Sequence, residues 1–93
     1  MRLGTGTESF EVANWMVDQQ NITVVVSGFW SLGAAGGWSM GGGHGSITSF
    51  LGLGADQVLS LNVVTADGSF LTADPTQNED LFFALRGGGG GTF

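Results

Sequence analysis

The residues best placed to do chemistry in this sequence are glycines, gathered in one stretch from Ser31 to Leu53. Glycine loses more backbone freedom on folding than any other residue, so a chain concentrates it where it serves a purpose. Two common purposes are a positive φ in a turn and close approach of the backbone to a ligand. Trp30, Trp38 and Phe50 lie beside and among these glycines, where large rings can fill the space that glycine leaves. The stretch therefore predicts one wall of a cofactor site, with a glycine-rich surface loop as the alternative.

Known phosphate-binding motifs are incomplete in this chain. It contains no full Gly-x-Gly-x-x-Gly, and a Walker A motif is excluded because the sequence has no Lys. Any phosphate would therefore be held by backbone N–H groups, which need glycine to come close.

The titratable side chains offer little catalytic chemistry. His44 is the only histidine, and no Ser or Cys partner is evident for it, so a loop position is favoured over a catalytic role. A single histidine does not make a metal site either. The carboxylates at Asp67, Asp74 and Glu79 fall at expected turns and helix starts and predict structural roles. Asp56, directly after the glycine stretch, is the carboxylate whose role stays most open. No catalytic residue and no metal site is assigned.

Composition limits the classes of partner. The chain has 93 residues, enough for one small domain, and a net charge of −6 with Arg2 and Arg86 as its only basic side chains. This charge argues against a nucleic-acid surface and against docking on an anionic membrane. No apolar run reaches the roughly 18 residues of a membrane-spanning helix, and no basic start precedes an apolar run as in a signal peptide. The absence of Cys excludes disulfides and leaves the compartment open.

The elements that would position the glycines are short. Residues 1–6 read as the end of a strand, and residues 8–19 as a helix with a capping box at Thr5 and Glu8. The β-branched run 22–27 predicts a buried strand that leads into the glycine stretch.

The second half of the chain predicts a hairpin and a helix. Residues 58–66 and 70–72 read as two strands joined by a turn at Asp67 and Gly68. Thr76 and Glu79 have capping-box spacing before a short helix that ends near Arg86. The five glycines that follow suit a helix C-cap. The expected order is β-α-β-glycine loop-β-β-α, an α+β fold.

Several motifs, in this order and spacing, carry a family resemblance. They are Ser31-Leu-Gly-Ala-Ala-Gly-Gly, Gly41-Gly-Gly-His, Gly52-Leu-Gly-Ala-Asp-Gln-Val-Leu, Val63-Val-Thr-Ala-Asp-Gly and Asn78-Glu-Asp-Leu-Phe-Phe-Ala-Leu-Arg followed by glycines. The chain resembles the berberine-bridge-enzyme-like branch of FAD-linked oxidases, fungal members in particular. The wider group is the vanillyl-alcohol-oxidase flavoproteins with a PCMH-type FAD-binding domain. The resemblance covers nearly the whole chain.

The resemblance implies that residues 1–93 form the C-terminal half of an FAD-binding PCMH-type domain, incomplete and without the substrate domain. In that family glycine loops lie against the pyrophosphate and flavin of an extended FAD. The positions that match this cofactor-binding region are Ser31, Gly33, Gly36, Gly37, Gly41, Gly42, Gly43 and His44, with Asp56 and Val58 in the segment leading to the next strand. The family oxidises an alcohol or amine carbon, or closes a ring, by hydride transfer to FAD, often with oxygen as acceptor.

The chain departs from the family pattern in two ways. Members with a doubly linked flavin carry a Cys where this chain has Phe29, so the resemblance implies FAD without a cysteinyl link. The loop with the flavin-linking His, the substrate domain and the Tyr-type base match no part of this sequence. A small-molecule substrate is therefore expected only for a parent enzyme. A non-catalytic truncated remnant, or a flavin-free glycine-rich binding protein, are the alternatives. Substrate, oligomeric state and compartment stay open.

Overall fold

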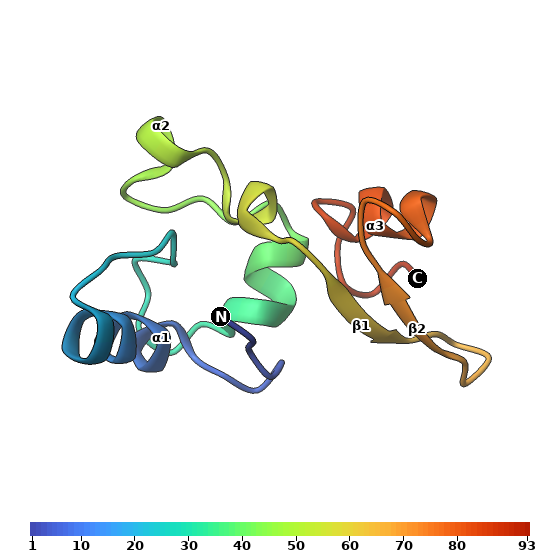
Figure 1. The fold of residues 1–93 in the computed structure, drawn as a ribbon, viewed down its shortest axis with the longest axis horizontal. Coiled ribbons are helices and arrows are strands. Elements are labelled where there is room, and N and C mark those ends of the chain that lie inside the picture. Colours follow the sequence, from blue (N-terminus) through green and yellow to red (C-terminus); the bar gives the residue numbers. More distant parts are fainter.

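The computed structural model describes the backbone of residues 1–93 and every side chain except that of Gln20. The molecule is elongated, 38 × 24 × 22 Å, with the helical N-terminal part at one end and a β-hairpin covered by a helix at the other (Figure 1). The elements in chain order are α1 (Ser9–Trp15), η1 (Met16–Gln20), η2 (Ala34–Trp38), α2 (Thr48–Leu51), η3 (Gly54–Gln57), β1 (Leu61–Val64), β2 (Phe70–Ala73) and α3 (Glu79–Leu85). The α+β class predicted from the sequence is confirmed, while the order of elements differs.

The first predicted helix is present as α1 with its continuation η1. Its cap is not the predicted Thr5–Glu8 pair: Glu8 is the N-cap residue, and its N–H donates to the Glu11 carboxylate at 2.8 Å. Thr5 lies outside the helix because the chain bends at residues 5–6 before α1 begins. The helix run ends at Asn21, whose φ of 52° places it in the left-handed region that stops a helix.

The strands predicted at residues 1–6 and 22–27 are wrong, since both segments are irregular. A strand is stabilised by the backbone of a neighbouring strand, and the ladder between β1 and β2 includes neither segment. Residues 22–27 are held by side-chain packing instead. Val25 is buried, and Val24 and Val26 pack on a small cluster of buried residues from α1, η1 and η2. The β-branched run predicted burial correctly for its second half only, since Ile22 and Thr23 are exposed, and it predicted pairing incorrectly.

The hairpin predicted around Asp67 and Gly68 is confirmed, with a first strand shorter than predicted and a second strand one residue longer. β1 and β2 pair antiparallel from Leu61 opposite Ala73 to Val64 opposite Phe70. Gly68 has a φ of 84°, which glycine adopts without strain. The Asp67 carboxylate accepts hydrogen bonds from the Thr65 hydroxyl, from the Ser69 N–H at 3.0 Å and from the Ser69 hydroxyl, and these bonds lower its pKa.

Helix α3 covers one face of the hairpin, where Phe82 and Leu85 are buried close to the fully buried Ala73. Its N-cap is Asn78, so the predicted Thr76–Glu79 capping box is wrong. Thr76 instead stabilises the chain just before α3, where its N–H and hydroxyl both donate to the Asp74 carboxylate, at 2.8 and 2.7 Å. Hydrogen bonds from the Gln77 and Thr76 side chains are the main reason that the pKa of Asp74 falls from 3.8 to about 2.

Candidate functional site

Two neighbouring hollows open on the two sides of Trp38, which lines both. The first, called here the glycine hollow, has a volume of about 540 Å³ and is open to one side. Its lining is Ser27, Gly28, Phe29, Leu32, Gly37, Trp38, Gly41, Gly43, His44, Gly45 and Ser46. Five of these eleven residues are glycines, so much of the wall is bare backbone.

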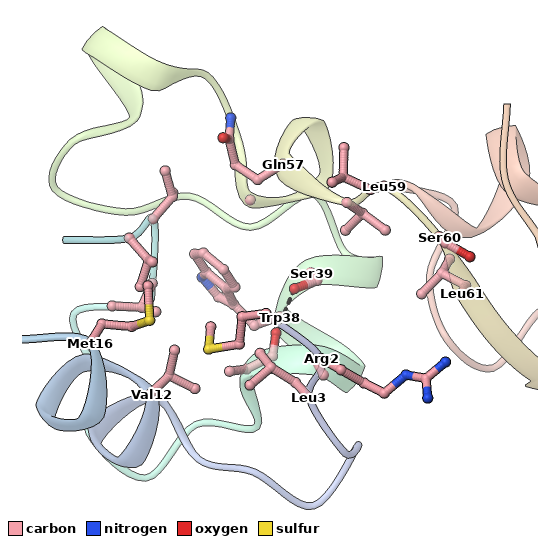
Figure 2. A pocket seen from close by; sticks show the side chains of 18 of the residues that line it. Arg2, Leu3, Val12, Met16, Trp38, Ser39, Gln57, Leu59, Ser60 and Leu61 are labelled. Carbon is pink, nitrogen blue, oxygen red and sulfur yellow. Dashed lines mark hydrogen bonds between the residues drawn. The ribbon is translucent and has the colours of Figure 1, made fainter. Parts of the chain in front are cut away.

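The second, the apolar hollow, has a volume of about 590 Å³ and lies between α1, residues 23–26, η2 and residues 57–62. Figure 2 shows the Trp38 indole at its middle, with Val12 and Met16 on one side and Leu59 and Leu61 on the other. The Arg2 side chain extends away from Trp38 at the rim. Side chains rather than backbone line this hollow, and its border at residues 23–26 has no strand partner, a setting that suits packing protein better than binding a dinucleotide.

Trp38 fixes the shape of the wall between the two hollows. Its indole N–H donates to the His44 carbonyl oxygen at 3.0 Å, and the Cζ3 and Cη2 atoms of its ring lie against Gly54. A Cβ on Gly54 would lie 2.5 Å from the ring, and one on Gly43 would lie 2.9 Å from the Gly54 Cα. The Gly54 N–H also donates to the Gly43 carbonyl at 2.7 Å. These two glycines are therefore required by packing within the chain itself.

Two further glycines are also explained by packing. A Cβ on Gly45 would lie 2.4 Å from the Val26 carbonyl oxygen, and one on Gly52 would lie 2.8 Å from the Asp56 carboxylate. Asp56 accepts the Leu53 N–H at 2.8 Å at the start of η3. This bond stabilises the start of η3 and so gives Asp56 a structural role, whereas the sequence alone left its role open.

Other glycines have no packing reason, and two of them face the glycine hollow. A Cβ on Gly28 or Gly37 would meet no atom within 4 Å, and neither residue has a positive φ. Across the described residues, the backbone N–H groups of Gly28, Gly43 and His44 donate to no acceptor of the chain. Gly28 and His44 are exposed, so an anion or a flat ligand can approach their N–H groups, whereas Gly43 is buried beside the Trp38 ring.

The charge of the lining fits an anionic group. Although the chain carries a net charge of −6, none of the residues around the glycine hollow is acidic. The two arginines lie elsewhere: Arg2 at the apolar hollow, and Arg86 with its guanidinium 4.4 Å from the centre of the Phe82 ring. A bound phosphate would therefore depend on backbone N–H groups, as the sequence predicts.

The structure brings some of the predicted site residues together and separates others. Gly37, Gly41, Gly43 and His44 share the glycine hollow, while Val58 lines the apolar hollow. The remaining predicted positions, Ser31, Gly33, Gly36, Gly42 and Asp56, line neither hollow.

Gly33 belongs to a turn pinned against the start of α1, through an isolated β-bridge to Glu8. The neighbouring Leu32 carbonyl accepts the Ser9 N–H at 2.9 Å, and the Ala34 N–H donates to the Thr7 carbonyl at 2.9 Å. This turn positions the first helical turn of η2 and so sets where Gly37 faces.

Seven residues of this hollow were not among the predicted site positions: Ser27, Gly28, Phe29, Leu32, Trp38, Gly45 and Ser46. The signal for Gly45 and Ser46 was their place directly after His44. Gly28 and Phe29 could have been found as a small residue and an exposed ring ahead of the glycine stretch.

Within the described part of the chain, no group of three or more His, Cys, Asp or Glu side chains lies close enough to hold a metal ion. None of the described helices has the length and apolar character needed to cross a membrane.

Comparison with known proteins decides the family. The profile of the FAD binding domain family matches residues 1–74. The chain belongs to this family. The FAD-linked oxidoreductase ZEB1 of Gibberella zeae is 46% identical over all of this chain and 16% of its own length. The VAO-type flavoprotein oxidase VAO615 of Thermothelomyces thermophilus is 48% identical over 99% of this chain, again 16% of its own length.

Solved structures agree with the family. The crystal structure of the VAO-type flavoprotein MtVAO615 from Myceliophthora thermophila C1 superimposes with a TM-score of 0.91, at 48% identity over 98% of this chain. A glucooligosaccharide oxidase from Acremonium strictum, whose structure concerns a 6-S-cysteinyl, 8α-N1-histidyl FAD, gives 0.87 at 36% identity over 94%. The chain spans 16% and 18% of these two proteins. The fold is thus that of the FAD-binding domain of VAO-type flavin oxidoreductases, and the cofactor of the family is FAD.

Proposed function

We propose that this chain supplies one wall of an FAD site and that the glycine hollow is that wall. The observation that carries the proposal is the combination of Gly28 and Gly37, whose missing Cβ atoms nothing else in the chain explains, with unpaired backbone N–H groups and no carboxylate around them. Bare backbone of this kind is what an anionic, flat dinucleotide requires.

The chain's own residues would hold the cofactor in two ways. The exposed N–H groups of Gly28 and His44 would donate to the diphosphate, since the lining has no Lys or Arg. Gly37 and Gly41 would let the cofactor lie against backbone. Trp38 would act indirectly, because its bond to the His44 carbonyl keeps residues 43–45 in place.

The other positions implied by the family resemblance belong to this proposal as well. Ser31, Gly33, Gly36 and Gly42 lie along the same stretch, and Val58 lies across Trp38 in the apolar hollow. An extended cofactor that reaches past Trp38 would contact both groups. Asp56 would support the site through η3 rather than by direct contact.

We infer that the chain is the C-terminal half of a PCMH-type domain and packs against further protein. Its exposed area is 6002 Å². A compact monomer of 9.5 kDa exposes about 5,000 Å². Large apolar side chains contribute to the excess, with Phe50 87% and Leu59 82% exposed. An exposed apolar surface of this extent is typical of a face that another part of a protein covers.

In such a parent enzyme FAD would accept a hydride from an alcohol or amine carbon of a small substrate and pass the electrons on, often to oxygen. No residue of this chain is assigned as the catalytic base. The flavin would have no cysteinyl link, because Phe29 stands where the linking residue would be. A berberine-bridge-enzyme-like substrate range belongs to the same proposal.

Equilibrium dialysis of the full chain against FAD tests the site. Gly37→Leu adds a side chain at the glycine hollow from a position where a Cβ would meet no atom within 4 Å, and it should raise the Kd by at least about tenfold, a loss of roughly 1.4 kcal/mol. Gly6→Leu is the matched control, since a Cβ there also meets no atom and the residue lines neither hollow. Equal affinities for the two variants, or no binding by the unaltered chain, would overturn the proposal.

A further inference from the structure

Phe29 is the one aromatic residue of the glycine hollow that is left almost bare. Its side chain is 78% exposed although it lines the hollow, whose other lining residues include five glycines. Exposure of a large ring beside an apolar and uncharged surface has no stabilising role in the chain itself.

The backbone under this ring is held firmly. The hydroxyl of Ser27, itself only 9% exposed, accepts the Phe29 N–H at 2.8 Å and donates to the Phe29 carbonyl oxygen at 3.2 Å. The same carbonyl accepts the Leu32 N–H at 3.4 Å and so closes a turn. A ring on a fixed backbone loses less freedom when a ligand packs on it than a ring on a loose loop.

We propose that Phe29 is a stacking platform for a planar ring system of the bound cofactor, one of the two ring systems of FAD. This inference rests on the proposed function and adds a specific contact to it. Gly28, directly before the ring, leaves room for the flat face of a ligand because its missing Cβ meets nothing within 4 Å. Aromatic rings gain from offset stacking beyond the area that they bury.

Trp30 provides the contrast within the same turn. It is 66% exposed, similar in size and chemistry, and yet it does not line the glycine hollow. Its carbonyl is bonded to the Phe10 N–H at 3.0 Å, which ties its backbone to α1. If the exposed rings of this turn are simply covered by other protein, replacing Phe29 and replacing Trp30 should have the same effect on the Kd for FAD.

Equilibrium dialysis of the full chain, Phe29→Leu and Trp30→Leu against FAD tests the inference. Phe29→Leu should raise the Kd roughly two- to tenfold, the loss of one aromatic stacking contact, while Trp30→Leu leaves it unchanged. Phe29→Tyr should restore the affinity because it keeps the ring. Far-UV circular dichroism should be the same for all four proteins, since both residues are exposed.

Repeating the dialysis with FMN and with ADP identifies the ring. A weaker affinity of Phe29→Leu for FMN alone assigns the isoalloxazine, and for ADP alone the adenine; either result supports the platform. The inference is overturned if Phe29→Leu binds FAD as the unaltered chain does, or if both Leu variants lose affinity equally. If the unaltered chain binds no FAD, the proposed function itself has failed, and the platform fails with it.

Discussion

Gly54→Ala is the substitution that most sharply tests how the glycine stretch is packed. The added Cβ would lie 2.5 and 2.6 Å from two ring atoms of Trp38 and 3.3 Å from the Gly43 carbonyl oxygen. Real Cβ contacts stay beyond 3.0 Å, so the indole must move by at least about 0.5 Å. The ring is not free to do so, because its N–H is bonded to the His44 carbonyl.

The expected cost follows from two opposing effects. Overpacking of this kind costs about 1–3 kcal/mol, and loss of the Trp38–His44 hydrogen bond lies within that range. Replacing Gly by Ala gains about 0.4–1 kcal/mol by restricting the unfolded chain. We expect Gly54→Ala to lower the free energy of unfolding by about 1–2 kcal/mol.

Urea unfolding followed by far-UV circular dichroism measures this change. With a slope of about 1–2 kcal/mol per molar, the midpoint should fall by about 1 M. Trimethylamine N-oxide in all samples keeps a small domain within its folded range. Gly6→Ala is the control, because its Cβ meets nothing within 4 Å and its φ is not positive, so its midpoint should stay or rise. Equal midpoints for the two variants would refute the packing described around Trp38.

Four other outcomes are expected. Gly45→Ala, whose Cβ would lie 2.4 Å from the Val26 carbonyl, should lower the thermal midpoint and weaken FAD binding, and unchanged values would contradict that contact. The Asp74 carboxyl should titrate by NMR near its pKa of about 2; its stabilising effect is present above pH 3.8 and lost as the pH falls through 2, and Asp74→Asn should remove this dependence. Arg86→Met should cost about 0.5–1 kcal/mol in urea unfolding by removing the guanidinium from the Phe82 ring. The isolated chain with FAD should form no hydrogen peroxide from alcohols or amines above a free-flavin blank, and measurable turnover would place a catalytic base within these 93 residues.

Local signals in the sequence were enough for the hairpin, for α1 and for α3, whereas the short helices η2, α2 and η3 were not predicted. Asp67 and Gly68 specify their turn by chemistry that acts over a few residues, and the apolar spacing of α3 matches its buried residues, Phe82 and Leu85. In α1 the match is poor, since Ser9 and Val12 are buried while Phe10 is 38% exposed. The helix caps were missed because several polar residues near each start could serve. Glu11 and Asn78 were selected by the path of the chain rather than by spacing.

Strand pairing could not be read from one segment alone. Residues 22–27 have the composition of a buried strand, but pairing depends on a neighbour that the β1–β2 ladder does not provide. The glycine stretch was recognised as one unit, yet its glycines serve two purposes. Gly43 and Gly54 allow two segments separated in sequence to pack against each other. Gly28 and Gly37 make no such contact, and only the three-dimensional structure distinguishes the two kinds of glycine.

NMR chemical-shift mapping of the glycine amides during an FAD titration tests the central claim most directly, since each backbone N–H reports on its own surroundings. The account predicts shifts at Gly28, Gly37, Gly41 and Gly43 and none at Gly68, which lies in the turn between β1 and β2. Shifts confined to residues around the apolar hollow, or no shifts at saturating FAD, would contradict the assignment of the glycine hollow as the cofactor wall.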